Sequence, residues 1–286
     1  MKLWLNGKIV DANSARIAPN DRGFLLGDGL FETLLIQNGT PVFLAEHHAR
    51  LLASTRTLAF PSCPSLESLT QAIEDLLKAN DLEAQPRIAA RITLARGPAP
   101  RGILPPANAT PTCLISVAPS PTPPTHARAI IATPRRNDRS PLSGLKMLGY
   151  QEAIFAKQEA AAKGVEEAVL LNTQDELACT SVGNIFCWFK EARLVTPPLS
   201  AGILPGITRA KIIELAREQG LAVHEETITQ AQLATATGAF STNSLVGLQT
   251  LSELDGHILT APPEQAALQK AYDALLSRQA KRKGGA

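Results

Sequence analysis

The stretch Ala118-Pro-Ser-Pro-Thr-Pro-Pro-Thr125 decides how this chain is organised. Four of its eight residues are proline, and nine prolines fall among the 27 residues from Pro98 to Pro124. Proline has no backbone N–H and a fixed φ angle, so such a run can continue neither a helix nor a central strand. It predicts a linker over residues 119–126 between two domains, residues 1–118 and 127–286.

The length and charge of the chain agree with this division and exclude one class of partner. A chain of 286 residues is long enough for two domains of roughly 150 residues each. It carries 28 lysines and arginines against 26 aspartates and glutamates, a formal charge of +2. Nucleic-acid binding needs a basic surplus or stripe, and the basic cluster of Arg278, Lys281, Arg282 and Lys283 is explained more simply by a solvated helix end. We therefore expect no nucleic-acid partner.

The sequence shows no membrane or export signal. No run of eighteen apolar residues occurs, and the first ten residues lack a long apolar segment, so we expect neither a membrane partner nor a signal peptide. The four cysteines, Cys63, Cys113, Cys179 and Cys187, are widely spaced and form no CxxC motif. This pattern predicts reduced thiols in a cytoplasmic protein and no metal site.

Turn dipeptides and alternating apolar residues predict antiparallel sheet in the first domain. Asn6-Gly7, between strands at 2–5 and 8–10, is typical of a hairpin with a type I′ turn, and Asn38-Gly39 signals a second hairpin. Ser65 is a plausible N-cap for a following helix. The other elements expected here are strands over 30–37, 41–44, 87–95 and 112–118 and helices over 44–58 and 66–77.

The second domain is predicted to mix grouped strands with helices. Gly220 suits the left-handed position after a helix that ends at Gln219. The expected helices cover 148–163, 208–219 and 263 to about 281, and the expected strands cover 127–133, 167–171, 185–189, 194–196, 238–242 and 246–251. Strands and helices that are grouped, and not strictly alternating, indicate an α+β fold in two unequal domains.

Lys146 is the first candidate for chemistry, because its immediate neighbours are Leu145 and Met147. A lysine in apolar surroundings loses solvation of its charged form, so its pKa falls and the neutral amine becomes a nucleophile able to form a Schiff base. The alternative is a lysine at a loop-to-helix junction whose amine reaches water. These residues alone favour the alternative.

Three further segments offer donors for an anion, each with a structural alternative. Gly206-Ile-Thr208 precedes a predicted helix, where free N–H groups and the Thr208 hydroxyl can bind phosphate, or where Thr208 simply caps the helix. Thr242-Asn-Ser244 lies at a strand end and is either a donor set or a polar turn. Arg50 is either a phosphate ligand or a surface residue, and the adjacent His47 and His48 point about 100° apart on a helix, which makes a poor metal pair.

Six motifs, taken in chain order, share one pattern. They are Asp21-Arg-Gly-Phe-Leu-Leu-Gly-Asp-Gly-Leu-Phe-Glu-Thr33, His47-His-Ala-Arg50-Leu, the Lys146 segment, Asn184-Ile-Phe186, Leu204-Pro-Gly-Ile-Thr-Arg209 and Ser241-Thr-Asn-Ser-Leu245. Together they resemble the class IV pyridoxal-phosphate-dependent aminotransferases, the fold-type IV enzymes that include D-amino-acid transaminases, branched-chain aminotransferases and 4-amino-4-deoxychorismate lyases. The resemblance extends from the Asn6-Gly7 hairpin to about Gly256. It implies a small N-terminal α/β domain and a larger C-terminal domain with a mixed sheet or pseudo-barrel.

The resemblance also implies a cofactor, a site and an assembly. The cofactor is pyridoxal 5′-phosphate, which supplies the electron sink while the protein supplies position and tuning. The expected cofactor-binding residues are Arg50, Lys146, Cys179, Ser181, Gly206, Ile207, Thr208, Thr242 and Asn243, with Lys146 as the Schiff-base lysine and Arg50 on the phosphate. The expected catalytic residues are Lys146 and Thr33, and the expected substrate-binding residues are Phe31, Arg96, Arg101 and Tyr150. Relatives in the family imply a homodimer whose cofactor sites lie between the two domains of each subunit.

Cys179 departs from the pattern of the family. Counting back from Asn184, it occupies the position of the glutamate that pairs with the pyridine nitrogen of the cofactor. A neutral thiol cannot supply that charge, so the nitrogen is expected to be unprotonated, or protonated with help from another group such as Glu176. This tilts the expectation toward a lyase whose product becomes aromatic. The alternatives are a register shifted by a few residues, or a cysteine that is only a small buried hydrophobe.

Other details divide between two branches of the family. Phe31, in place of a tyrosine, and the run from Arg139 to Lys146 resemble the 4-amino-4-deoxychorismate lyases, whereas the segment Arg96 to Arg101 resembles the D-amino-acid transaminases. In that second branch a histidine helps to hold the substrate carboxylate, and its position here is Ile103. We expect a 4-amino-4-deoxychorismate lyase that releases pyruvate and 4-aminobenzoate. The alternatives are a transaminase of D-amino or branched-chain amino acids and, third, a cofactor-binding protein without activity.

Overall fold

The computed structural model describes residues 1–281 and divides into two compact units. Among the described residues, the first unit contains Met1–Thr122, Leu145–Gly149 and residues 276–281, and the second contains Pro123–Gly144 and Tyr150–Leu275. The chain first passes from one unit to the other at Thr122, inside the proline run. Arg282 and Lys283 of the basic C-terminal cluster lie outside the described residues.

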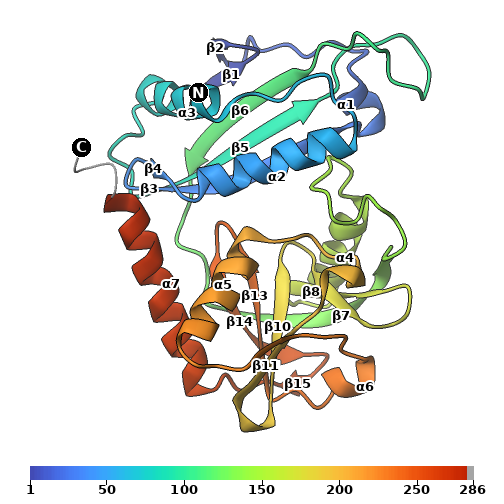
Figure 1. Cartoon of the computed structure of the whole chain (residues 1–286), viewed down its shortest axis with the longest axis vertical. Coiled ribbons are helices and arrows are strands. Elements are labelled where there is room, and N and C mark those ends of the chain that lie inside the picture. The colour runs from blue at the N-terminus through green and yellow to red at the C-terminus, as the bar shows by residue number, and fades with distance from the viewer. Residues whose placement is uncertain (282–286) are drawn as a thin grey trace. The chain divides into compact units, whose positions relative to one another are not determined.

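The first unit is built on a six-stranded antiparallel sheet in the order β2-β1-β6-β5-β3-β4 (Figure 1). The strands are β1 (Lys2–Leu5), β2 (Lys8–Asp11), β3 (Gly29–Gln37), β4 (Thr40–Pro41), β5 (Arg87–Ala95) and β6 (Thr112–Pro119). Asn6 and Gly7 have φ angles of 48° and 89°, so the predicted type I′ turn is confirmed. Asn38 and Gly39, at 49° and 75°, form the second predicted turn.

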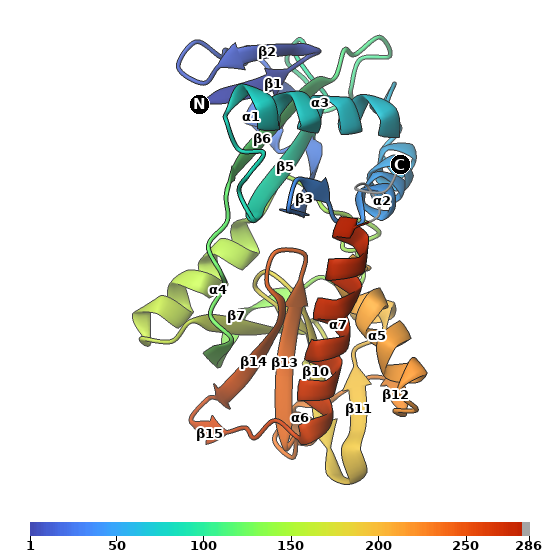
Figure 2. The ribbon, with the colours of Figure 1, turned by 90° about the vertical axis from the view of Figure 1, so that its left-hand side faces the viewer.

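Helices α2 (Leu44–Thr57) and α3 (Leu66–Ala79) cover this sheet, α2 over β3 and α3 over β6 (Figure 2). The Ser65 hydroxyl accepts a hydrogen bond from Ser68 N at 3.1 Å, which confirms the predicted cap. The core between sheet and helices contains Leu30, Leu34 and Ile36, which point to one face of β3 because successive side chains alternate. Glu32 stands in the same row of side chains and is also buried. The short helix α1 (Arg22–Leu26) precedes β3.

The second unit is built on a nine-stranded mixed sheet that curls into a half-barrel (Figure 2). The order is β12-β11-β10-β13-β14-β7-β8-β9, with β15 beside β14, and three of the pairs are parallel: β11 with β12, β14 with β7, and β7 with β8. The strands are β7 (His126–Arg136), β8 (Glu167–Asn172), β9 (Leu177–Thr180), β10 (Asn184–Phe189), β11 (Arg193–Thr196), β12 (Val223–Glu225), β13 (Gly238–Asn243), β14 (Gly247–Leu254) and β15 (His257–Ile258). This is the predicted α+β fold with its mixed second sheet.

Four further α-helices belong to the described chain, together with the short 3-10 helices Lys190–Ala192 and Leu199–Ala201. The four α-helices are α4 (Gln151–Ala162), α5 (Ile207–Glu218), α6 (Gln230–Leu233) and α7 (Pro263–Lys281). Helix α4 packs on β7 and β8, and α5 packs against β13. Gly220 has a φ of 75°, so the left-handed position predicted after α5 is confirmed. Between residues 1 and 281, no helix has both the length and the apolar character that crossing a membrane requires.

The helix predicted over 148–163 is confirmed over Gln151–Ala162, but its predicted start at Leu148 is wrong, because Leu148 pairs with β3 instead. Phe31 N donates to Lys146 O at 2.9 Å, and Leu148 N donates to Gly29 O at 3.0 Å. A backbone that makes these sheet-like bonds cannot also be helical, so α4 begins only at Gln151. A Cβ at Gly29 would lie 2.5 Å from Leu148 Cδ1, which is why the segment can approach β3 only at a glycine.

Candidate active site

The amine of Lys146 lies over the ring of Phe31. Both residues were predicted to belong to one site. Lys146 Nζ is 4.2 Å from the centroid of the Phe31 ring, which is buried. Leu145 and Met147 pack against the apolar core of the first unit, so the apolar neighbours noted in the sequence do surround this backbone. The arrangement places the primary amine of the half-buried Lys146 against an aromatic face.

Arg91 is a residue that sequence reasoning missed. Its guanidinium carbon is 3.8 Å from the same ring centroid of Phe31. Because both distances end at one point, Lys146 Nζ and Arg91 Cζ lie no more than about 8 Å apart. Arg91 pairs with Thr33 in the β3–β5 register, so Phe31, Thr33 and Arg91 share one face of the sheet. Only this register could have revealed Arg91, and the sequence does not state it.

The opposite face of β3 carries a buried charged cluster. Glu32 Oε1 accepts from Arg50 Nε at 2.8 Å, and Glu32 Oε2 accepts from Arg50 Nη2 at 2.6 Å. His47 Nδ1 lies 2.7 Å from Glu32 Oε2. Burial raises the pKa of Glu32, but hydrogen bonds from Arg50 and His47 outweigh it and hold the pKa below its usual value. The predicted phosphate ligand Arg50 is thus fixed by a carboxylate.

The second unit holds a candidate anion-binding cup at the start of α5. Gly206 is the N-cap of this helix and offers no side-chain cap, so the first N–H groups of α5 are not capped by a side chain. The alternative in which Thr208 caps the helix is wrong. The hydroxyls of Thr208 and Thr242 are both buried, and neither has a hydrogen-bond partner within the part of the chain that the structure describes.

Asn184 connects β13 with the loop that precedes α5, the two segments that form this cup. It pairs with Thr242 across β10 and β13, and its Nδ2 donates to Leu204 O at 2.9 Å. A Cβ at Gly206 would lie only 2.0 Å from Asn184 Oδ1, so this close approach requires glycine. Buried hydroxyls without partners are rare, because each costs the solvation it has lost. Two of them beside an uncapped helix N-terminus are the donors that a phosphate group needs, so the residues present fit pyridoxal 5′-phosphate.

The side chains of Asn243 and Ser181 both make hydrogen bonds within the protein. Asn243 Oδ1 accepts from Leu245 N at 3.0 Å and Val246 N at 2.9 Å, which closes the turn between β13 and β14. Ser181 Oγ donates to the buried carboxylate of Glu167, and Ser181 N donates to Ala168 O at 2.8 Å. These bonds fix both residues at the ends of β13 and β9.

Cys179 lies in β9 opposite Leu170, between two apolar clusters of the second unit. Burial raises the pKa of its thiol to about 11; Arg136 opposes this shift, and Glu167 and Glu152 add to it. The side chain is therefore a neutral thiol near pH 7. Glu176, which the sequence offered as a substitute charge, accepts a hydrogen bond from Asn172 Nδ2 at 3.1 Å.

The structure gives Arg96 a different setting from the one expected. Its Nε bonds Asp28 at 3.0 Å, its Nη1 and Nη2 donate to Ala59 O and Leu58 O, and its guanidinium lies over Phe60. Arg96 is 4% exposed, and these contacts connect the end of β5 to the end of α2. Arg101 is exposed in the loop after β5, and Tyr150 directly precedes α4 in the second unit.

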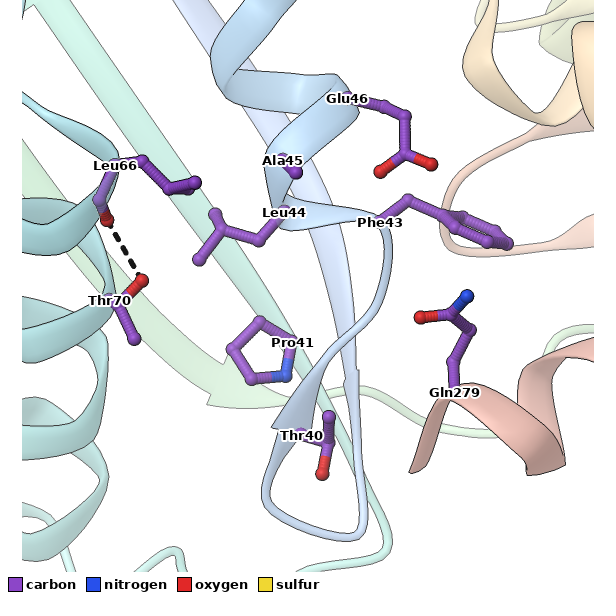
Figure 3. Close-up of a pocket in the computed structure, with 9 residues that line it drawn as sticks. All are labelled: Thr40, Pro41, Phe43, Leu44, Ala45, Glu46, Leu66, Thr70 and Gln279. Atoms are coloured by element: carbon purple, nitrogen blue, oxygen red, sulfur yellow. Dashed lines mark hydrogen bonds between the residues drawn. The ribbon is translucent and has the colours of Figure 1, made fainter. Parts of the chain in front are cut away.

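A separate pocket in the first unit contains none of the predicted site residues (Figure 3). It is lined by Thr40, Pro41, Phe43, Leu44, Ala45, Glu46, Leu66, Thr70 and Gln279. Among the described residues no group of three or more histidine, cysteine, aspartate or glutamate side chains is placed to hold a metal ion.

Comparison with known proteins identifies one family. The family model "Amino-transferase class IV" matches residues 29–254. A putative branched-chain-amino-acid aminotransferase of Methanocaldococcus jannaschii is 33% identical over 262 residues, 91% of this chain and 90% of that protein. The aminodeoxychorismate lyase of Bacillus subtilis is 28% identical over 288 residues, 99% of this chain and 97% of that protein.

A solved structure agrees with these matches. The putative 4-amino-4-deoxychorismate lyase from Legionella pneumophila superposes with a TM-score of 0.86 at 29% identity, over 92% of this chain and 97% of that one. Proteins with the two activities resemble this chain to a similar degree. The choice between the activities therefore rests on the residues of the site.

Proposed function

The chain belongs to the class IV aminotransferase family of pyridoxal-phosphate-dependent aminotransferases and lyases, and from this premise we propose that it is a 4-amino-4-deoxychorismate lyase. The observation that carries the proposal is the neutral thiol of Cys179 at the position where the family places a glutamate. The reaction releases pyruvate and 4-aminobenzoate from the substrate.

The neutral thiol favours elimination over transamination. When bound, pyridoxal 5′-phosphate binds the substrate amine covalently and accepts electrons from the bond that breaks. Its ring accepts electrons best when its nitrogen is protonated, and a thiol with a raised pKa provides no negative charge to keep that proton. An elimination that makes an aromatic ring gains driving force from its product, so it depends less on a strong electron acceptor.

The residues of the first unit have distinct roles in this proposal. Lys146 Nζ would hold the cofactor, and the same amine would move the proton that allows pyruvate to leave. The ring of Phe31 keeps that amine in a fixed place and limits water around it. Arg91, within about 8 Å of the amine, is our candidate to receive a substrate carboxylate, with Thr33 beside it on the same face.

In this proposal, residues of the cup and of the loops bind the phosphate and the remaining substrate groups. The residues that would hold the phosphate are Arg50 in the first unit and, in the second unit, the amides of Gly206 and Ile207 with the hydroxyls of Thr208 and Thr242. Asn243 and Ser181, at the ends of β13 and β9, are kept in the proposal as cofactor-binding residues. Arg101 and Tyr150 remain candidates for the departing enolpyruvyl group.

Turnover of the synthetic substrate tests the proposal. Protein loaded with pyridoxal 5′-phosphate is incubated with 4-amino-4-deoxychorismate, and pyruvate is followed by coupling to lactate dehydrogenase. We expect pyruvate and 4-aminobenzoate in equal amounts, and none above background from Lys146→Ala. No pyruvate from the wild type, together with turnover of an amino donor and 2-oxoglutarate, contradicts the lyase assignment.

A transaminase is the second candidate, favoured by the 33% identity to the putative branched-chain-amino-acid aminotransferase. Such an enzyme converts its cofactor to the pyridoxamine form when leucine or D-alanine is added alone, which absorbance reports directly. A lyase without transaminase activity leaves the spectrum of the loaded enzyme unchanged.

We infer two further properties from the family and from the cysteines. The protein is a homodimer, which sedimentation would show as twice the mass of one chain. It works in the reducing cytoplasm, in keeping with the free thiols of Cys63, Cys113, Cys179 and Cys187.

A further inference from the structure

Glu32 is a buried carboxylate for which the proposed chemistry has no direct use. It is 1% exposed and stands in the row of β3 that otherwise points Leu30, Leu34 and Ile36 into the apolar core. A charge in such a place is unfavourable unless it is paired and hydrogen-bonded. The burial of this charge therefore indicates that Glu32 has a role toward its two hydrogen-bonding partners.

Both partners of Glu32 come from one side of α2. His47 and Arg50 are three residues apart on this helix, so their side chains point the same way. Arg50 presents two N–H groups, Nε and Nη2, to the two carboxylate oxygens at 2.8 and 2.6 Å. A bidentate pair of this kind fixes the plane of the guanidinium, whereas a single bond would let it rotate.

This pairing decides which edge of Arg50 is directed elsewhere. A guanidinium has five N–H groups in one plane, and Glu32 takes the edge formed by Nε and one Nη2 hydrogen. The second edge, formed by Nη1 and the other Nη2 hydrogen, must then point away from Glu32. That edge has the two parallel N–H groups that suit two oxygens of a phosphate.

His47 holds Glu32 from the other side of the carboxylate. Burial lowers the pKa of His47; the hydrogen bond and charge of Glu32 oppose this shift but do not cancel it, and the charges of Arg50 and Lys146 add to it, so the neutral ring predominates near pH 7. A neutral ring bonded through Nδ1 to a carboxylate must carry its proton on Nδ1 and donate it. The cluster then holds one negative charge, on Glu32, and one positive charge, on Arg50.

The geometry points to Glu32 as the positioning residue for the phosphate of the cofactor, acting through Arg50 and held in place by His47. This inference rests on the proposed function, in which Arg50 binds that phosphate. Glu32 itself touches neither cofactor nor substrate in this account. Its role is to fix one edge of Arg50 so that the other edge is presented in a single orientation.

A comparison of two ligands separates this role from a merely structural one. Pyridoxal lacks the phosphate of pyridoxal 5′-phosphate but is otherwise the same molecule. The dissociation constants of both are measured by absorbance titration of the full chain after removal of cofactor. In Glu32→Gln we expect the constant for pyridoxal 5′-phosphate to rise about tenfold and that for pyridoxal to change less than about twofold, because only the phosphate meets Arg50.

Three further variants sharpen the result. Glu32→Asp keeps the charge and should restore part of the preference for the phosphorylated ligand. His47→Asn should lose less of that preference than Glu32→Gln, because Arg50 still pairs with Glu32. Glu32→Gln added to Arg50→Lys should cause no further loss, since the residue through which Glu32 acts is already gone.

The outcomes are distinct. If Glu32→Gln folds and weakens both ligands equally, or neither, Glu32 is only structural and the inference is wrong. If that variant does not fold, the inference is decided by His47→Asn and Glu32→Asp, and an unchanged ligand preference in both overturns it. If Glu32→Gln loses the preference for pyridoxal 5′-phosphate as expected, but the wild type releases no pyruvate from the substrate, the lyase assignment fails and the role of Glu32 stands.

Discussion

Each unit carries a candidate anion-binding group, and the two groups are of opposite kinds. In the first unit the group is a full charge, Arg50, whose partner Glu32 is buried in the core. In the second unit the groups are neutral: backbone N–H groups at the start of α5 and the hydroxyls of Thr208 and Thr242. The charged group is paired inside the protein, whereas the hydroxyls have no partner within residues 1–281.

This difference separates stability from binding. Removing one member of a buried ion pair leaves the other charge exposed to an apolar core, so the fold itself should suffer. Removing a buried hydroxyl that has no partner removes a desolvation cost that no hydrogen bond compensates, so the stability of the fold should be unchanged or slightly higher. Under the proposed function, the cup of the second unit would serve the ligand alone, and the cluster of the first unit would serve both fold and ligand.

The largest expected effect is on the charged cluster. Glu32→Leu should lower the free energy of unfolding by about 3–5 kcal/mol, because Arg50 remains buried without its carboxylate. Urea unfolding checks this through the fluorescence of Trp4 in the first unit and of Trp188 in the second. A loss below about 1 kcal/mol would mean that the cluster does not support the fold.

The cup should show the reverse behaviour. Thr208→Val and Thr242→Val should each raise the dissociation constant of pyridoxal 5′-phosphate about tenfold, with the stability of the cofactor-free protein changed by less than about 0.5 kcal/mol. Thr55→Val is the matched control, since the buried Thr55 hydroxyl donates to Leu52 O at 2.8 Å. That control should lose about 1 kcal/mol of stability and keep its cofactor affinity. Equal effects in all three variants would erase the difference between the two regions.

Acid should weaken the first unit through His47. Its pKa is lowered in the folded state, so below the unfolded value of about 6.5 the unfolded chain binds more protons and stability falls as pH falls. Glu32, whose folded pKa is also lowered, adds a loss of the same sign below about pH 4.3. One such group contributes a slope of at most about 1.4 kcal/mol per pH unit.

Urea unfolding of the wild type and of His47→Asn between pH 7.5 and about 5 measures this slope. We expect the variant to lose the part of the slope that begins near pH 6.5. Parallel curves for the two proteins would show that His47 is already protonated in the folded state, which contradicts its assignment as a neutral donor.

The local features of the fold were predictable from the sequence. The turn at Asn6-Gly7, the cap at Ser65 and the left-handed Gly220 depend on a few neighbouring residues, and the structure confirms all three. The predicted helix is present from Gln151, but its expected start at Leu148 is wrong because Leu148 pairs with Gly29, more than a hundred residues earlier, and no local pattern records such a contact.

The site divides in the same way. Lys146, Arg50 and Thr242 were named from motifs, yet the partners that explain two of them were not. Glu32 holds Arg50 from 18 residues away on another element, and Arg91 joins Lys146 only through the register of β3 and β5. The neutral state of Cys179 depends on burial between two clusters, which spacing cannot show.

The smallest expected effect is at Cys179 when its charge is conserved. Cys179→Ser keeps a small neutral side chain, so the rate of pyruvate release should stay within about threefold of the wild type. A much larger loss would mean that the thiol does more than remain uncharged. It would then be the thiol itself, and not its neutrality, that distinguishes this site.

The central claim, that a neutral group at position 179 directs the enzyme to elimination, is tested most directly by Cys179→Glu. One measurement decides it: the ratio of pyruvate released from 4-amino-4-deoxychorismate to pyridoxamine form produced from D-alanine or leucine, in wild type and variant. We predict a high ratio in the wild type and a lower one in Cys179→Glu, because the carboxylate strengthens the cofactor ring as an electron acceptor. An unchanged ratio, or a wild type that already favours transamination, would contradict the account.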